Sequence, residues 1–181
     1  MLIGSSGVGK STIINQIFNS PLAKVDPGQR CTLESKLYTT GDSPFNLIDS
    51  RGAEKNEDYT LKEVKEETMK LISDKLDDPD PNNHIHCVIY CVTANRFFKD
   101  EMEIIQKIRE KYDGKKLPII IVYTRAINDE EVNGVKNAIE KFLAKFNEKI
   151  SDDPFGISFI KIYAKEHSYE KNGQKYLDPM F

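Results

Sequence analysis

Short apolar segments alternate with amphipathic segments along most of the chain. In the amphipathic segments, apolar residues recur every three or four positions, which is the spacing of one face of an α-helix. The apolar segments are bounded by glycine, proline and other turn residues, as expected of strands. The expected strands are 1–3, 33–39, 45–48, 84–92, 117–123 and 158–163, and the expected helices are 10–18, 58–76, 98–112 and 132–146.

Two of the apolar segments, 84–92 and 117–123, are almost continuous. This pattern is typical of central parallel strands that are covered on both faces. Strands that alternate with helices form a mostly parallel sheet with helices packed on both sides. The pattern therefore predicts the α/β class, as a three-layer domain around a mixed, mostly parallel six-stranded sheet.

Both ends of the chain depart from this pattern. The first apolar segment has three residues, where strands usually have about five or six. Near the other end, the pair Asn172-Gly173 favours a hairpin within 169–176, and no helical pattern follows it. We expect a single domain over 1–181, with 166–181 as a terminal hairpin or extension, and a chain that is truncated at one or both ends.

Composition limits the partners. The net charge of 26 − 29 = −3 gives no reason to expect nucleic-acid or anionic-membrane binding. No apolar run approaches the roughly 20 residues that span a bilayer. The three cysteines, an odd number, suit a reducing compartment. We expect a cytoplasmic protein, with a peripheral membrane position left open if the chain is part of a larger one.

The strongest chemical signal lies directly after the first apolar segment. Residues 4–11 read GSSGVGKS and match the phosphate-binding pattern G-x-x-x-x-G-K-[ST], between an expected strand and an expected helix. Its glycines let backbone N–H groups surround an anion, its lysine places a charge on the terminal phosphates, and its serine offers a hydroxyl to Mg²⁺. The expected nucleotide-binding residues are Gly4, Ser5, Ser6, Gly7, Val8, Gly9, Lys10, Ser11 and Thr12.

A second magnesium element follows the strand 45–48. Asp49 ends that strand and Gly52 follows three positions later, giving the pattern D-x-x-G. The carboxylate can hold a magnesium-bound water, and the Gly52 N–H can reach a γ-phosphate. Thr32 precedes the second strand and can complete the metal shell. We therefore expect Ser11, Thr32 and Asp49 to organise Mg²⁺, and Lys10, Thr32 and Gly52 to serve the reaction.

Two polar loops, 26–33 with Thr32 and 52–59 with Gly52, are the expected switches. Such loops become ordered around a γ-phosphate and relax when it is lost.

In this order, the motifs resemble those of the P-loop GTPase superfamily, whose domain is the Ras-like G domain. The resemblance extends from Leu2 to about Glu166, and is nearest to the translation-factor-related group of septin, immune-associated and chloroplast-import type. It implies GTP and GDP as ligands, with Mg²⁺. It also implies that Thr124 and Arg125 match the start of the family's base-reading motif, and that Ala164 and Lys165 match its second base contact.

Two positions depart from the family. Ile127 stands where an aspartate normally accepts two hydrogen bonds from guanine, and Asp129 could compensate only through a shifted loop. Ala53 stands where many members have the glutamine that orients the attacking water, so intrinsic hydrolysis should be slow. Arg30, Arg51 or a protein partner could supply a transition-state charge.

The sequence thus predicts a guanine-nucleotide switch with weak GTP hydrolase activity. Two alternatives stay open. One is a nonhydrolysing module that dimerises across the nucleotide face as a scaffold, which Ala53 favours. The other is an ATP-binding P-loop protein with a diverged base site, which Ile127 favours. The expected partners are the nucleotide, and either a second copy of the chain or an activating protein.

Overall fold

The computed structural model describes residues 1–23, 35–41, 43–50, 61–93, 99–112, 117–146, 150, 156–163, 168–171 and 174–177. For 61, 64, 99–101, 146, 163, 168–171 and 174–177 only the backbone is described.

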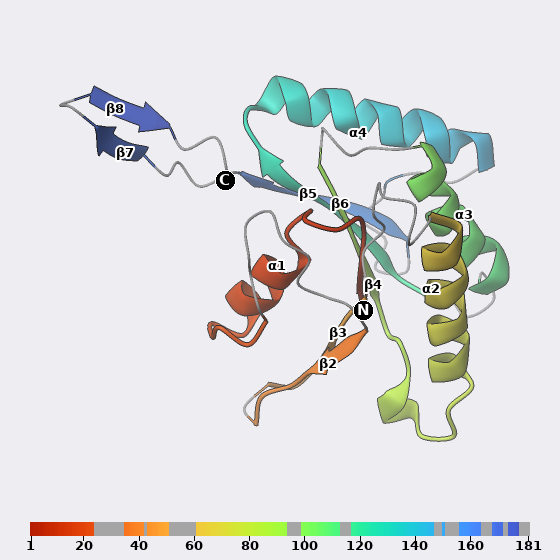
Figure 1. Cartoon of the computed structure of the whole chain (residues 1–181). Helices are drawn as coiled ribbons and strands as arrows, with labels where there is room; N and C mark the ends of the chain where they lie inside the picture. Colours follow the sequence, from red (N-terminus) through yellow and green to blue (C-terminus); the bar gives the residue numbers. More distant parts are fainter. Residues whose placement is uncertain are drawn as a thin grey trace.

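A six-stranded sheet forms the centre of the molecule, in the order β2-β3-β1-β4-β5-β6 (Figure 1). β2 and β3 are antiparallel, and the other neighbouring strands are parallel. This confirms the mixed, mostly parallel six-stranded sheet expected from the sequence. The strands are β1 (Leu2–Ile3), β2 (Lys36–Tyr38), β3 (Leu47–Asp49), β4 (Val88–Val92), β5 (Ile119–Ala126) and β6 (Ile157–Tyr163).

The helices cover both faces of the sheet (Figure 1). They are α1 (Lys10–Ile17), α2 (Leu61–Leu76), α3 (Lys99–Tyr112) and α4 (Asp129–Leu143), with short 3-10 turns η1 (Pro81–Asn83) and η4 (Ala144–Phe146). One apolar core joins the sheet to α2, α3 and α4, and a second joins its other face to α1. In β4, Tyr90 belongs to the first core and Cys91 to the second, because successive side chains of a strand point to opposite faces.

Two expected strand boundaries were wrong by several residues. The apolar segment 84–92 becomes a strand only at Val88, since His84 instead closes the preceding turn, with its Nε2 2.8 Å from the Asp78 carbonyl oxygen. The segment 117–123 begins later, at Ile119, and its strand continues to Ala126, beyond a register shift against β6. The hairpin near the end of the chain is confirmed as antiparallel β7 (Ser168–Lys171) and β8 (Gln174–Leu177).

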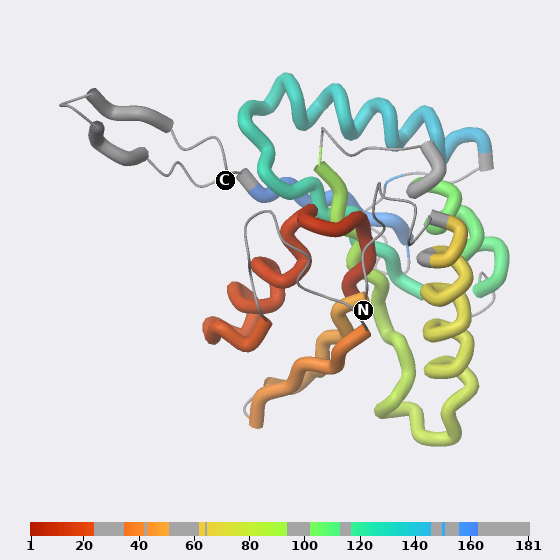
Figure 2. The backbone as a smooth tube through the Cα atoms, viewed as in Figure 1, coloured from red at the N-terminus to blue at the C-terminus, as the bar shows by residue number. Residues whose placement is uncertain are grey.

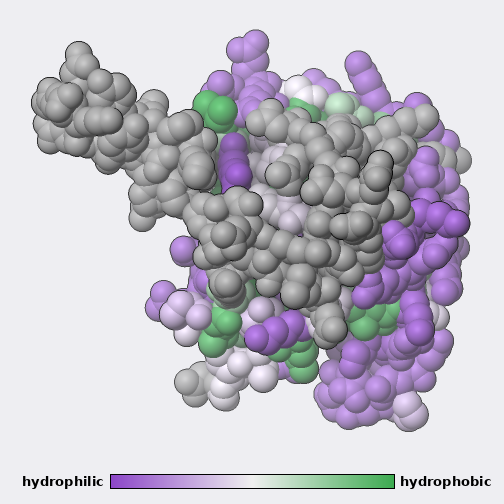
Figure 3. All heavy atoms as spheres, viewed as in Figure 1, coloured by the Kyte–Doolittle hydropathy of each residue, from purple (hydrophilic) through white to green (hydrophobic). Residues whose placement is uncertain are grey.

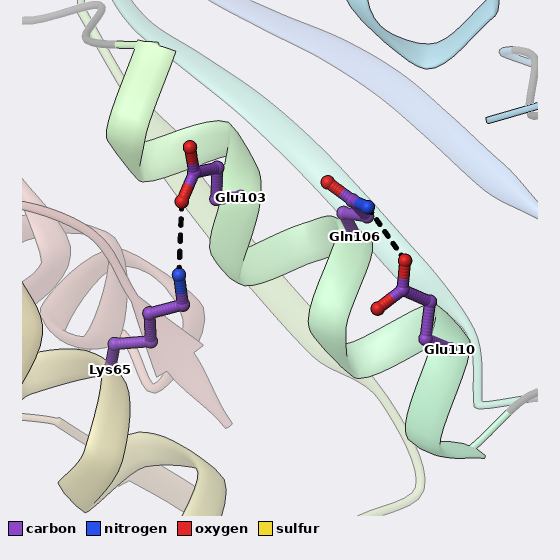
Figure 4. A network of polar contacts seen from close by, with 4 residues as sticks. All are labelled: Lys65, Glu103, Gln106 and Glu110. Atoms are coloured by element: carbon purple, nitrogen blue, oxygen red, sulfur yellow. Dashed lines mark hydrogen bonds and ion pairs between the residues drawn. The ribbon is translucent and has the colours of Figure 1, made fainter. Parts of the chain in front are cut away.

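Polar contacts tie α2 to α3. The Lys65 ammonium lies 3.0 Å from Glu103 Oε2, and the Lys65 side chain is only 16% exposed (Figure 4). On the same helix as Glu103, Gln106 donates a hydrogen bond to Glu110 at 2.6 Å (Figure 4). Because α2 is the next described element after β3, this contact fixes the helix that follows the D-x-x-G segment.

The surface over α2 and α4 is largely hydrophilic in the view of Figure 3, with apolar residues in small separate patches. This is the expected outer face of helices that bury one apolar stripe. Among the described residues, no helix is both long and apolar enough to cross a membrane.

Candidate functional site

The segment between β1 and α1 is a tight turn built on glycine backbone geometry. Gly4, Gly7 and Gly9 have φ angles of 138°, 73° and 100°, a region that side chains with a Cβ rarely adopt. Gly9 is the residue that caps the start of α1. Figure 2 shows the backbone turning here from the short β1 directly into the helix. The motif Gly4–Ser11 therefore has the strand–turn–helix context that a phosphate loop needs.

Close packing on β4 fixes the start of this loop. A Cβ added to Gly4 would lie 2.3 Å from the carbonyl oxygen of Cys91, far inside van der Waals contact. Cys91 itself is completely buried, and desolvation by that burial raises the pKa of its thiol to about 12, although the nearby Lys10 charge acts in the opposite direction. The loop thus rests on the end of a central strand rather than extending into solvent.

Lys10 begins α1 and turns its side chain back into the loop. Its Nζ donates hydrogen bonds to the carbonyl oxygens of Gly4 at 2.9 Å and Ser5 at 3.1 Å, and the residue is 6% exposed. A buried ammonium needs such partners, because an uncompensated charge in the interior is costly. The result is a fixed positive charge inside the loop, at the N-terminal end of a helix. Both features attract anions.

Ser11 and Asp49 meet beside the loop. The Ser11 hydroxyl donates to Asp49 Oδ2 over a long 3.4 Å, and Asp49 is fully buried. Pairing of β1 with β3 brings them together, since Leu2 is in register with Asp49 and the Ser50 N–H donates to the Leu2 carbonyl oxygen. A hydroxyl and a carboxylate side by side are the oxygen ligands that Mg²⁺ prefers. These two residues could therefore hold that ion.

Thr124 lies under the loop near the end of β5. Its hydroxyl oxygen is 2.6 Å from the Val8 carbonyl oxygen and 3.1 Å from the Val92 carbonyl oxygen, and the residue is 5% exposed. The sequence placed Thr124 at the base-reading motif, and the structure brings it against the phosphate loop. Val8 is itself buried, at 1% exposure, so the contact lies in the interior.

The residues that follow Thr124 along the chain form the outer rim of the site. Arg125 is exposed and has a φ of 58°, unusual for a residue other than glycine, and the register of β5 against β6 shifts here. Ile127 is 75% exposed. Asp129, which the sequence offered as a substitute acid, begins α4 and pairs with Lys161 of β6 at 2.7 Å.

Of the other predicted site residues, some are described by the structure and some lie outside the described residues. Within the loop, Ser5 is buried, Ser6 is half-buried, and Thr12 on the first turn of α1 is exposed. Thr32, Gly52, Ala164 and Lys165 lie outside the described residues, as do Arg30, Arg51 and Ala53, so their roles stay predictions.

Sequence reasoning missed Asn128 and Glu131. The Asn128 side chain caps α4 by accepting a hydrogen bond from the Glu131 N–H at 2.9 Å, and Glu131 Oε2 accepts one from the Ile127 N–H at 2.9 Å. An N-cap residue followed three positions later by glutamate is a recognised helix-start pattern, so the signal was present in the sequence.

Comparison with known proteins finds a family and several relatives. The family model described as 50S ribosome-binding GTPase matches residues 1–125, more than half of the chain. The tRNA modification GTPase MnmE of Christiangramia forsetii is 28% identical over 149 residues, which are 77% of this chain and 29% of MnmE. Sporulation-regulated protein 3 of Saccharomyces cerevisiae is 24% identical over 79% of this chain and 30% of its own length. GTPase Der of Bartonella bacilliformis is 31% identical over 42% of this chain and 16% of its own length.

One solved structure has the same fold at low identity. It belongs to work on the chloroplast translocon components atToc33 and psToc159, which describes dimerization as important for their GTPase activity. The superposition has a TM-score of 0.57 at 18% identity and covers 97% of this chain and 74% of that one. The chain spans less than a third of the length of each of the three curated relatives.

Proposed function

The chain belongs to the family described as 50S ribosome-binding GTPase, and on this premise we propose that it is a guanine-nucleotide switch that binds GTP with Mg²⁺ and hydrolyses it slowly to GDP. The observation that carries the proposal is the Lys10 ammonium, held inside a loop of three positive-φ glycines by the carbonyl oxygens of Gly4 and Ser5. A positive charge held inside a glycine-rich loop at a helix N-terminus is complementary to a polyphosphate.

Each part of the loop has a proposed role. The backbone N–H groups from Gly4 to Ser11 bind the phosphate oxygens, and Lys10 exchanges its two loop carbonyls for the β- and γ-phosphate oxygens. Thr12, which is exposed on the first turn of α1, is proposed to contact the same ligand. Thr124 keeps the loop in position through the Val8 carbonyl. Arg125, Ala164 and Lys165 are proposed to contact the base.

Magnesium binding is proposed for Ser11, Asp49 and Thr32. The 3.4 Å contact between Ser11 and Asp49 supports it, since both side chains present oxygen at one point beside the loop. When bound, the ion would neutralise charge that develops on the β- and γ-phosphates. Complete burial fixes Asp49, so its oxygens need little reorganisation.

Slow hydrolysis is proposed from the residues expected to lie near the γ-phosphate. Thr32 and Gly52 are proposed to sense the γ-phosphate, and Ala53 has no polar group to orient an attacking water. An arginine can accelerate such reactions by about 10³–10⁵. Arg30, Arg51 or an activating partner is therefore proposed as the source of the missing charge.

A scaffold that dimerises without hydrolysis is the alternative that Ala53 favours. Dimerization is described as important for the GTPase activity of the chloroplast translocon components. For this chain we propose contact between two copies across the nucleotide face. An ATP-binding protein with a diverged base site is the alternative that Ile127 favours. Phosphate binding by the loop serves either nucleotide, so base preference must be measured.

We propose residues 1–181 as one G domain, with 166–181 as an extension, and a cytoplasmic location. The chain covers 29% and 30% of the length of two of its relatives. The proposal therefore concerns this domain and does not extend to the substrates or partners of a longer protein.

Calorimetric titration with GTP and with ATP, each with Mg²⁺, tests the function. We expect micromolar or tighter binding of GTP, a clear preference over ATP, and loss of binding in Lys10→Ala. Equal or tighter ATP binding would overturn the guanine assignment in favour of the second alternative. Phosphate release measured beside mass by light scattering separates a slow GTPase from a scaffold, since a scaffold doubles its mass with GTP and releases no phosphate.

A further inference from the structure

The proposed guanine site lacks its usual acid, because the position three residues after Thr124 is Ile127. Three carboxylates follow at the start of α4: Asp129, Glu130 and Glu131. Guanine differs from adenine in presenting two adjacent N–H donors, so selectivity for it requires an acceptor at this rim. The inference below rests on the proposed function and identifies which acceptor serves it.

Glu131 returns its carboxylate to the position where the acid is missing. Its Oε2 accepts a hydrogen bond from the backbone N–H of Ile127 at 2.9 Å. Asn128, which caps the helix, accepts from the Glu131 N–H at 2.9 Å and so fixes the first turn from which this side chain starts. A carboxylate within hydrogen-bond distance of residue 127 lies close to where an aspartate at 127 would place its own.

Asp129 faces a different neighbour. Its Oδ1 is 2.7 Å from the ammonium of Lys161 on β6, which directs this side chain along the sheet edge and compensates its charge. The Asp129 carboxylate is therefore held toward β6. The Glu131 carboxylate is held at Ile127 and can accept from the base without losing that bond, because a carboxylate oxygen that accepts one N–H still has a lone pair, and the second oxygen has two.

Thr124 places this turn beside the phosphate loop. Its bond to the Val8 carbonyl joins the end of β5 to the phosphate loop. Two residues separate Thr124 from Ile127, and Arg125 between them is held at a φ of 58°. Such a conformation persists only where the surroundings impose it, which marks the turn as a constrained part of the site.

We propose that Glu131 is the guanine-specificity residue of this domain and takes the place of the acid absent at Ile127. Its carboxylate accepts hydrogen bonds from N1–H and the 2-amino group of the base while remaining bonded to the Ile127 N–H.

Glu131→Gln tests the assignment, because glutamine keeps a carbonyl acceptor for the Ile127 N–H but loses the charge and one acceptor. We expect GTP affinity to fall about 10- to 100-fold. Affinity for xanthosine triphosphate should rise, since its 2-oxo group accepts from the new amide. Asp129→Asn is the matched control and should keep wild-type GTP affinity. Ile127→Asp in the Glu131→Gln background should restore GTP binding.

A purely structural capping role would change the melting temperature and leave the ratio of GTP to xanthosine triphosphate affinity unchanged, and that result would overturn the inference. A loss in Asp129→Asn in place of Glu131→Gln would overturn it too. A second test uses the wild-type protein alone, with inosine triphosphate, which lacks the 2-amino group. We expect it to bind about tenfold more weakly than GTP. Equal affinity would contradict the proposal. If the wild type binds no guanine nucleotide at all, the proposed function itself fails.

Discussion

The hydroxyl oxygen of Thr124 lies 2.6 Å from the carbonyl oxygen of Val8, a residue 116 positions earlier in the chain. The same hydroxyl lies 3.1 Å from the Val92 carbonyl oxygen at the end of β4. One buried side chain thus connects the phosphate loop with the ends of β4 and β5. The segment proposed to read the base is therefore joined to the phosphate loop by a buried contact.

Thr124→Val should weaken both folding and nucleotide binding. Valine has nearly the same shape but no hydroxyl, so the buried carbonyl oxygens of Val8 and Val92 lose a donor. The free energy of unfolding should fall by about 1–3 kcal/mol, and GTP affinity should fall with it because the loop is no longer fixed. Urea denaturation and calorimetry measure the two effects. Thr124→Ser keeps the hydroxyl and is the control, and a Val variant as stable and as tight-binding as wild type would refute the connection.

Gly4→Ala should be the most damaging single-methyl change in the loop. The new Cβ would lie 2.3 Å from the Cys91 carbonyl oxygen, and the φ of 138° disfavours any side chain. We expect a loss of about 2–4 kcal/mol of unfolding free energy. Gly134→Ala is the matched control: it lies within α4 with nothing within 4 Å of the added Cβ. It should stabilise the protein by about 0.5–1 kcal/mol.

Chemical denaturation of both glycine variants checks this prediction. Equal stability of the two would show that the loop does not press on β4 in solution.

Removal of Mg²⁺ should lower GTP affinity in the same way as substitution of its proposed ligands. Ser11→Ala and Asp49→Asn should each lower GTP affinity at least about tenfold in the presence of Mg²⁺, because a hard cation loses an oxygen ligand. In EDTA the Ser11→Ala variant should match the wild type. Ser43→Ala removes an exposed hydroxyl that bonds the Phe45 carbonyl oxygen, and it should keep the full magnesium effect. An undiminished magnesium dependence in both ligand variants would remove Ser11 and Asp49 from the metal site.

Cys91 should resist thiol reagents in the native state. Burial raises the pKa of its thiol from about 9 to about 12, so at pH 8 the reactive thiolate is about 10³-fold scarcer than in the unfolded chain. Burial also raises the pKa of the Cys87 thiol, but Cys87 is only half-buried and should be labelled first. Labelling with iodoacetamide, followed by mass mapping of peptides, measures both. Rapid native modification of Cys91 would contradict its burial under Gly4.

The sign of the pH effect follows from the same shift. The folded state disfavours the thiolate, so the neutral Cys91 thiol contributes stability below about pH 9 that is lost as the pH rises toward about 12. Replacement of Cys91 by alanine should flatten the part of the stability curve that lies in this window.

Most of the architecture was predictable from local pattern. The six strands and four helices were recovered because apolar periodicity depends on which face of each element is buried. The boundaries were less accurate where a side chain made an alternative contact. His84 bonds the Asp78 carbonyl oxygen, and β5 continues past a register shift to Ala126, and neither is visible in hydropathy.

The sequence by itself determined the phosphate loop, since its eight consecutive residues carry their own backbone requirements, and it also exposed the departures at Ala53 and Ile127. Only the tertiary structure decided which distant side chains meet there. Parallel pairing brings the ends of β1, β3, β4 and β5 to one edge of the sheet, which places Ser11 against Asp49 and Thr124 under Val8. It also decided that Asp129 pairs with Lys161, because this contact depends on where α4 starts relative to β6.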